Sequence, residues 1–179
     1  MNAATDAKTF ETAPEKTFTI TRTFNAPRDL VWKCWTDINH MKQWFGPKGT
    51  KIVGDSTLEL KPGGMFHYGM QMPDGNVMWG KQIYREIKEP ELLVVVTSFS
   101  DKDRGYTRHP MAPKWPLEML SRTTFQEESG KTIMHLTCYP INATEEECAL
   151  FDSSHSSMNG GFAGTFAQLD EYLASIQRK

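Results

Sequence analysis

The segment APRDLVWKCWTDINHMKQWFGP, residues 26–47, holds three of the chain's five tryptophans among charged and polar residues. Pro27 suits the first turn of a helix, where its missing backbone N–H is not needed. From there the apolar residues recur on one helical face. That face consists of Leu30, Val31, Cys34, Trp35 and Ile38. The spacing predicts a short helix with one buried stripe, and Trp32 lies beyond the edge of that stripe.

A second short helix is expected directly after the first. Either Asp37 or Asn39 has the side chain of a helix cap, and the turn GPKG at 46–49 ends the helix. Its apolar residues are Met41, Trp44 and Phe45. The three tryptophans then have different roles. We expect Trp35 to pack in the core, Trp32 to pack against the sheet edge or the long loop within 98–120, and Trp44 with Phe45 to close the mouth of a cavity.

Outward from this segment, the chain alternates between strand and helix patterns. Residues 17–24 alternate as a half-buried strand, with Arg22 as the exception. About six more strands follow, joined by turns such as KPGG at 61–64 and PDG at 73–75. Thr144 and Glu147 have capping-box spacing, and apolar residues from 158 to 176 then recur with a helical period.

This order of elements predicts an α+β fold. An antiparallel meander exposes one apolar face unless another element covers it, and only the last helix is long enough to do so. We therefore expect a helix-grip arrangement, in which a curved antiparallel sheet of about seven strands surrounds a long C-terminal helix. The two short helices after the first strand would close one end.

Composition excludes several classes of function. The chain has 179 residues and a net charge of −2, which gives no basic footprint for nucleic acid. Its longest apolar runs, such as LLVVV at 92–96, are too short to span a bilayer. Residues 1–15 resemble a disordered tail without a secretory signal, so we expect one domain over 16–179 and a cytoplasmic protein with reduced cysteines.

The sequence gives little support for catalysis. Its five histidines are scattered without metal-ligand spacing. The glycines match neither a P-loop nor a dinucleotide fingerprint. DSSHSS at 152–157 contains the residue types of a triad, but a triad is defined by geometry, and a solvated patch is the simpler interpretation. We therefore predict no catalytic residues, no metal and no cofactor.

The distribution of large apolar side chains points instead to a cavity. Methionine fills irregular space and adapts to varied ligands. The residues predicted to line a cavity are Trp35, Trp44, Phe45, Phe66, Tyr68, Met70, Trp79, Tyr84, Met119, Met158, Phe162 and Phe166. The alternative is that these side chains pack against one another. Gly160 and Gly161 allow close backbone packing, a bend, a hinge or free volume under the last helix, and the sequence leaves these open.

A loop too long for a hairpin spans residues 98–120. Three prolines, at 110, 113 and 116, stiffen it. Its apolar underside is predicted to consist of Tyr106, His109, Met111 and Trp115. The loop is a candidate lid over the cavity mouth, with a dimer contact or plain packing on the sheet as alternatives.

Together these motifs resemble a known family. They are TITRTFNAPRDLVWKCWTDINHMKQWFGPKG at 19–49, KPGG at 61–64, FSD at 99–101, TRHPMAPKWPLEML at 107–120, GKT at 130–132, NATEEE at 142–147 and LDEYL at 169–173. The chain resembles the START-like helix-grip superfamily (SRPBCC) from about residue 16 to 176. Within it, the chain is similar to the C-terminal homology domain of the Aha activator of a heat-shock-chaperone ATPase.

The resemblance implies a seven-stranded sheet around the C-terminal helix and a cavity that binds hydrophobic small molecules in many relatives. Phe45 stands where the subgroup often has a second tryptophan, and Phe162 follows Gly161 where Gly-Trp is common. Both positions keep an aromatic ring, so we expect a cavity of altered volume. The separate N-terminal region of full-length Aha activators has no counterpart here, which argues against chaperone activation.

Three functions are compatible with these observations. The first is non-enzymatic binding of a hydrophobic or aromatic small molecule, by a monomer or homodimer. The second is a polyketide-cyclase-like or hydrolase-like enzyme using the same cavity, for which Tyr68, Tyr84, His109 and Glu118 are the groups to inspect. The third is a chaperone-linked or regulatory protein-interaction module, which requires an exposed apolar patch.

Overall fold

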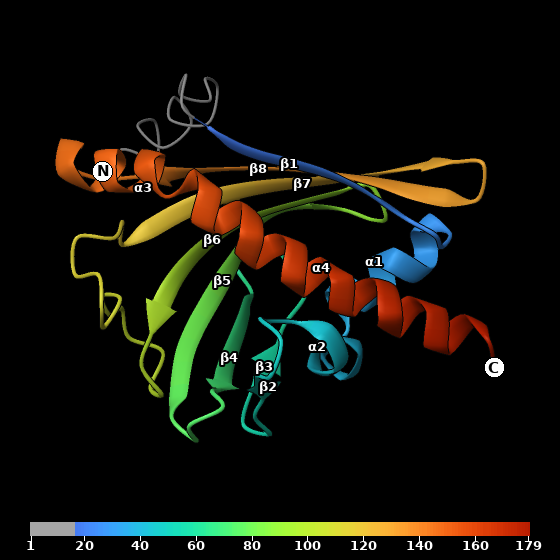
Figure 1. Cartoon of the computed structure of the whole chain (residues 1–179), viewed down its shortest axis with the longest axis horizontal. Coiled ribbons are helices and arrows are strands. Elements are labelled where there is room, and N and C mark those ends of the chain that lie inside the picture. Colours follow the sequence, from blue (N-terminus) through green and yellow to red (C-terminus); the bar gives the residue numbers. More distant parts are fainter. Residues whose placement is uncertain (1–16) are drawn as a thin grey trace.

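A computed structural model describes residues 17–179 (Figure 1). The expected tail at 1–15 lies outside the described residues. The first half consists of β1 (Phe18–Phe24), α1 (Arg28–Thr36), α2 (Ile38–Trp44), β2 (Lys51–Ile52), β3 (Thr57–Leu58) and β4 (Met65–Gln71). The second half consists of β5 (Val77–Lys88), β6 (Leu92–Ser100), β7 (Glu118–Glu128), β8 (Lys131–Ile141), α3 (Glu145–Ser153) and α4 (His155–Gln177).

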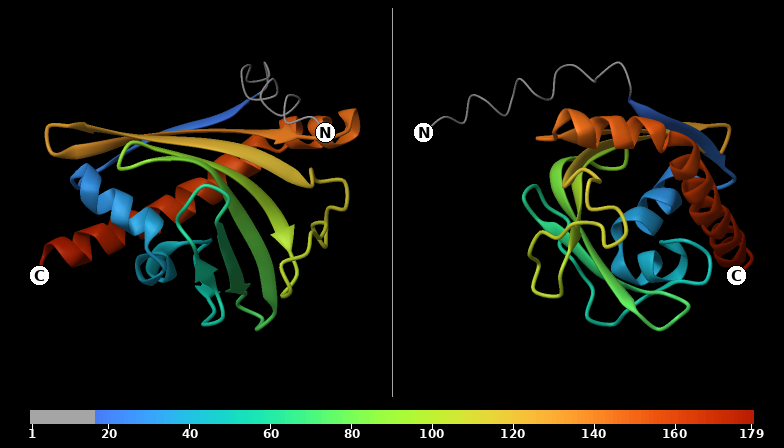
Figure 2. Two further views of the ribbon diagram at one scale, coloured as in Figure 1. Left: turned by 180° about the vertical axis from the view of Figure 1, so that it is seen from behind. Right: turned by 60° about the vertical axis from the view of Figure 1, so that its left-hand side comes forward.

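The strands form one antiparallel sheet. Its order is β1-β8-β7-β6-β5-β4-β2, and β3 pairs with β4 beside β2. The sheet curls around α4, and α1 and α2 lie at one end (Figures 1 and 2). This confirms the helix-grip fold predicted from the sequence. The sheet has eight strands, whereas the sequence predicts about seven. The difference arises because β2 and β3, with two residues each, are too short to show a periodic pattern.

The segment at 26–47 folds as two helices that meet at Asp37. The Asp37 carboxylate accepts a hydrogen bond from the Asn39 backbone N–H at 2.8 Å, so Asp37 is the cap of α2. Trp32 is 3% exposed and packs edge-to-face on Phe125 in β7, not at a sheet edge or in a loop. Because α1 is enclosed on more than one side, a single apolar stripe underestimates its buried surface.

Helix α4 is held against the rest of the fold by residues of its second half. Phe166, Leu169 and Leu173 form its buried face. Arg22 in β1, the exception to that strand's alternation, forms an ion pair with Asp170 of α4. The Gln168 side chain donates to the main-chain oxygens of Trp44 and Gly46, which ties α4 to the end of α2.

The glycines near the start of α4 lie on its outer side. A Cβ added to Gly160, Gly161 or Gly164 would meet no heavy atom within 4 Å. Close backbone packing therefore does not explain Gly160 and Gly161. Since neither glycine borders the cavity described below, they do not create its volume either.

Candidate ligand-binding cavity

A cavity of about 680 Å³ lies between the concave face of the sheet, helix α4 and the two short helices. Eleven of the residues predicted to line a cavity border it. They are Trp35, Trp44, Phe45, Tyr68, Met70, Trp79, Tyr84, Met119, Met158, Phe162 and Phe166. Aromatic rings from distant parts of the chain meet in its wall, where Trp35 lies 4.8 Å from Trp44 and 5.6 Å from Phe166 between ring centroids.

The register of the sheet determines which side chains form the cavity floor. Tyr84 pairs with Val95, and Gln82 pairs with Thr97, across β5 and β6. Ser121 pairs with Val95 and with Cys138, which extends the floor through β7 to β8. Because cross-strand partners share a face, these residues all project toward α4.

The KPGG turn lies beside β5 and continues its pairing with β4. The Gly63 N–H donates to the Tyr84 carbonyl at 2.8 Å, and the Tyr84 N–H donates to the Gly64 carbonyl at 3.0 Å. Gly63 has φ of +80°, a conformation that favours glycine. The turn therefore positions the main chain of Tyr84 where the pairing of β5 with β6 is irregular, between Tyr84 and Glu86.

Two predicted residues occupy other places. Phe66 is fully buried in the core, with its ring 5.4 Å from that of Phe45 and 4.7 Å from that of Tyr68. Trp79 borders the cavity, but its ring stacks on His67 at 4.8 Å. The β4–β5 register puts His67 and Trp79 on the outer face, opposite Tyr68. The prediction that Trp79 faces inward is therefore wrong for its ring.

The loop at 101–117 joins β6 to β7 and borders the cavity with only part of its length. His109 and Trp115 line the cavity. Tyr106 lies on the outer face, where its ring centroid is 3.4 Å from Nζ of Lys81, and Met111 is 89% exposed. The predicted apolar underside is thus wrong at Tyr106 and Met111, because the loop passes around the end of the sheet and turns these side chains away.

Sequence reasoning missed many of the residues that line the cavity. They are Pro47, Met72, Met78, Gly80, Gln82, Leu93, Val95, Thr97, Ser98, Phe99, Ala112, Pro116, Ser121, Thr123, Leu136, Cys138, Leu150, Ser154, Ser157 and Thr165. The alternation of inward-facing and outward-facing residues along β6 and β7 is the sequence pattern that could have identified them. Once one residue of a strand faces the cavity, every second residue follows it, but β6 reads as a continuous apolar run and hides the alternation.

The cavity is electrically neutral in its described lining, which includes no Asp, Glu, Lys or Arg. Burial raises the pKa of Tyr68 to about 12, and raises that of Tyr84 further. Burial also raises the pKa of the Cys138 thiol to about 11. At neutral pH these groups keep their protons, so none of them acts as a base or a thiolate nucleophile.

The other two candidate catalytic groups are His109 and Glu118. The His109 Nδ1 accepts a hydrogen bond from the Met111 backbone N–H at 3.0 Å, which puts the proton of the neutral ring on Nε2. Glu118 does not line the cavity, and its carboxylate accepts a hydrogen bond from the Tyr106 hydroxyl on the outer face. Within residues 17–179, no cluster of His, Cys, Asp or Glu is arranged to hold a metal ion.

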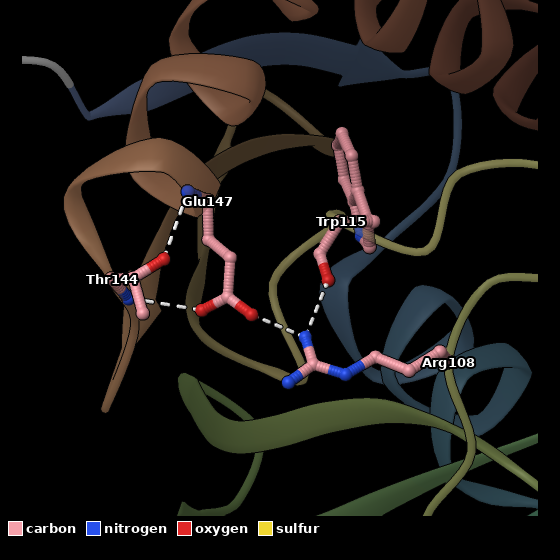
Figure 3. A network of polar contacts seen from close by, with 4 residues as sticks. All are labelled: Arg108, Trp115, Thr144 and Glu147. Atoms are coloured by element: carbon pink, nitrogen blue, oxygen red, sulfur yellow. Dashed lines mark hydrogen bonds and ion pairs between the residues drawn. The ribbon is translucent and has the colours of Figure 1, made fainter.

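A polar network ties the loop to α3 beside the cavity (Figure 3). The Arg108 guanidinium donates to the Glu147 carboxylate and, at 3.1 Å, to the Trp115 carbonyl. Glu147 also completes the capping box with Thr144, as the sequence predicted. The Trp115 ring lies 5.8 Å from that of Phe151 in α3. The network therefore holds Trp115 in the cavity wall.

Glu147→Gln is expected to reduce the free energy of unfolding by about 1 kcal/mol near neutral pH, because the ion pair with Arg108 is lost while glutamine preserves the capping box. The Thr144 backbone N–H, and then Arg108, hold the pKa of Glu147 below its usual 4.5. The stabilisation is complete above that value and lost as pH falls through the lowered pKa. Urea unfolding between neutral pH and pH values below 4.5 measures this.

Glu146→Gln is the control for this prediction. Glu146 pairs with Lys114, and both side chains are mostly exposed, at 64% and 62%. We expect little change in stability from its loss. Equal losses in the two variants, or a Glu147→Gln loss that persists in acid, would contradict the role assigned to the Arg108–Glu147 pair.

Comparison with known proteins agrees with this geometry. A family model described as "Activator of Hsp90 ATPase homolog 1-like protein" (AHSA1) matches residues 25–174. The chain belongs to the AHSA1 family. This confirms the resemblance seen in the sequence motifs. A comparison with curated protein sequences gives no significant match.

Solved structures share the AHSA1 fold. A protein from Nitrosomonas europaea is 24% identical with a TM-score of 0.72, over 94% of this chain and 99% of that one. A protein from Arthrobacter aurescens is 21% identical with a TM-score of 0.72, over 93% and 92%. Protein Ms6760 from Mycobacterium smegmatis is 24% identical with a TM-score of 0.68, over 88% and 90%.

In the described part of this AHSA1 chain, no helix is both long and apolar enough to cross a membrane.

Proposed function

We propose that this AHSA1-family chain binds a hydrophobic or aromatic small molecule in the cavity between its sheet and α4, without transforming it. The observation that carries the proposal is the cavity itself. Its volume of about 680 Å³ lies within the roughly 300–1,000 Å³ of small-molecule sites. Its walls combine aromatic rings with pliable methionines, such as Met70, Met119 and Met158.

The chemistry of the lining supports binding over catalysis. The buried tyrosines have raised pKa values and remain protonated. Cys138 is likewise protonated. A cyclase or hydrolase would need a base or a nucleophile facing the substrate, and the described lining supplies no activated one.

Filling the cavity is expected to prevent ligand binding. N-phenyl-1-naphthylamine, a neutral aromatic dye that becomes fluorescent in apolar surroundings, is a suitable probe for titration. Ser121→Phe places a ring on the cavity floor between Val95 and Cys138. We expect it to weaken dye binding at least about tenfold, because ring and dye compete for the same volume. Thermal unfolding of the variant checks that it remains folded.

The matched control is Ser175→Phe on the exposed surface of α4, which we expect to bind the dye as the unchanged protein does. A protein that binds neither this dye nor any lipid, flavonoid or polyketide in a native mass-spectrometry screen does not have the proposed function. Equal dye affinity in Ser121→Phe and Ser175→Phe would place binding outside the cavity.

A further inference from the structure

Three neutral polar side chains meet on the cavity floor. Gln82 and Thr97 are direct cross-strand partners, and Tyr84 follows Gln82 on the same face of β5. All three border the cavity. Other polar side chains, including Tyr68, His109, Ser121 and Thr123, also border the cavity. We call the neighbouring trio of Gln82, Tyr84 and Thr97 the floor patch.

The floor patch has unused hydrogen-bonding capacity. Tyr84 is only 2% exposed, yet no residue in the described part of the chain hydrogen-bonds to its hydroxyl. The fully enclosed polar atoms without a partner in that part are Arg28 Nε and His155 Nε2. The Tyr84 hydroxyl is not among them, so it opens onto the cavity that Tyr84 lines.

Gln82 and Thr97 complete the patch. Within residues 17–179, neither side chain is hydrogen-bonded to another protein group, and neither contributes a fully enclosed orphan atom. Between them, the amide and the two hydroxyls supply donors and acceptors. A polar group in an apolar enclosure is stabilised by a hydrogen-bonding partner, and an oxygen atom on a ligand would be such a partner.

The same cavity offers no carboxylate, ammonium or guanidinium group to neutralise a charged ligand, and the Nδ1 of its one described histidine, His109, already accepts the Met111 N–H. Its described lining holds no Asp, Glu, Lys or Arg. The nearby Arg108 does not line the cavity and is already paired with Glu147. An ionised carboxylate or ammonium group inside would lose its hydration without gaining an opposite charge, which is strongly unfavourable.

We propose that the cavity selects uncharged aromatic molecules that carry a hydroxyl or carbonyl oxygen, and that Tyr84, Gln82 and Thr97 bind this oxygen. The inference rests on the proposed function and adds two requirements. The ligand is neutral, and its polar atom points to the floor patch.

Competition between matched probes tests both requirements. Naphthalene, 2-naphthol and 2-naphthoate share one ring system, and at neutral pH only the last is charged. Each is titrated against N-phenyl-1-naphthylamine bound to the full chain. We expect 2-naphthol to bind roughly tenfold more tightly than naphthalene, through its hydrogen bond. We expect 2-naphthoate to bind at least roughly a hundredfold more weakly than 2-naphthol.

Two variants separate the patch from the rest of the cavity. Tyr84→Phe keeps the ring and removes the hydroxyl, and Gln82→Met keeps the length and removes the amide. We expect each to reduce the preference for 2-naphthol over naphthalene, because the variant loses a hydrogen-bonding group that only 2-naphthol uses. Tyr139→Phe is the matched control, since Tyr139 lies in a separate buried cluster with Val96 and Leu120 and should not alter the preference.

The outcomes distinguish the two proposals. If neither the dye nor any compound in the native mass-spectrometry screen binds, the proposed function fails, and this inference fails with it. If the dye binds but 2-naphthoate competes as well as 2-naphthol, the cavity does not select neutral molecules. If Tyr84→Phe and Gln82→Met both retain the full preference for 2-naphthol, the floor patch is not the binding group.

Discussion

Phe24→Ala is expected to lower the free energy of unfolding by about 3–5 kcal/mol. Phe24 is fully buried at the end of β1. Its ring packs edge-to-face against Trp35 of α1 at 6.1 Å and against Phe166 of α4 at 5.9 Å. The ring therefore joins the first strand, the first helix and the long helix. Its removal leaves a void between three elements whose main chains cannot close it completely.

Urea unfolding measures this loss, and thermal unfolding should show a midpoint lower by about 10 °C. Met111→Ala is the control, because Met111 is 89% exposed and its truncation should change stability by about 0.5 kcal/mol or less. A loss below about 1 kcal/mol for Phe24→Ala would contradict the central place assigned to this ring.

Gly64→Ala is expected to destabilise the protein by about 3 kcal/mol and to weaken ligand binding as well. A Cβ at this position would lie 2.2 Å from the Glu59 carbonyl oxygen and 2.9 Å from that of Lys61. Both obstacles are main-chain atoms, so the turn itself has to move. Since the Gly64 carbonyl accepts the Tyr84 N–H, the movement is transmitted to the cavity floor.

Urea unfolding and dye titration measure the two effects on one protein sample. Gly54→Ala is the matched control, since its Cβ would meet nothing within 4 Å, and we expect its stability and dye affinity to remain unchanged. Unchanged stability in Gly64→Ala would show that the turn accommodates a side chain. Lost stability with full dye affinity would show that Tyr84 is not positioned by this turn.

Much of the fold could be predicted because its signals are local. The capping box of Thr144 and Glu147 requires only four consecutive residues, and the structure contains it. The period of the last helix likewise appears within a single window of sequence. The sheet, the short helices after the first strand and the gripping helix were therefore all anticipated from neighbouring residues.

The residues of the candidate cavity are harder to predict from the sequence, because the face of the sheet on which a side chain lies depends on strand pairing. Trp79 and Tyr84 are both large aromatic residues in β5, but the register turns the ring of Trp79 to the outer face and that of Tyr84 inward. Likewise, Phe66 and Tyr68 share a face of β4, and Phe45 packs against both. Only Tyr68 borders the cavity, because Phe66 is covered by its neighbours.

Arg22 is a single residue at which the local sequence pattern and the tertiary structure differ in what they explain. Its position in β1 contradicted the alternation of that strand, and no neighbour in the sequence explained the exception. The partner is Asp170, 148 residues away in α4. Periodicity and capping determined the elements in residues 17–179 and their order. Tertiary structure alone decided the register, the cavity floor and the loop's path, because these depend on contacts between residues far apart in the chain.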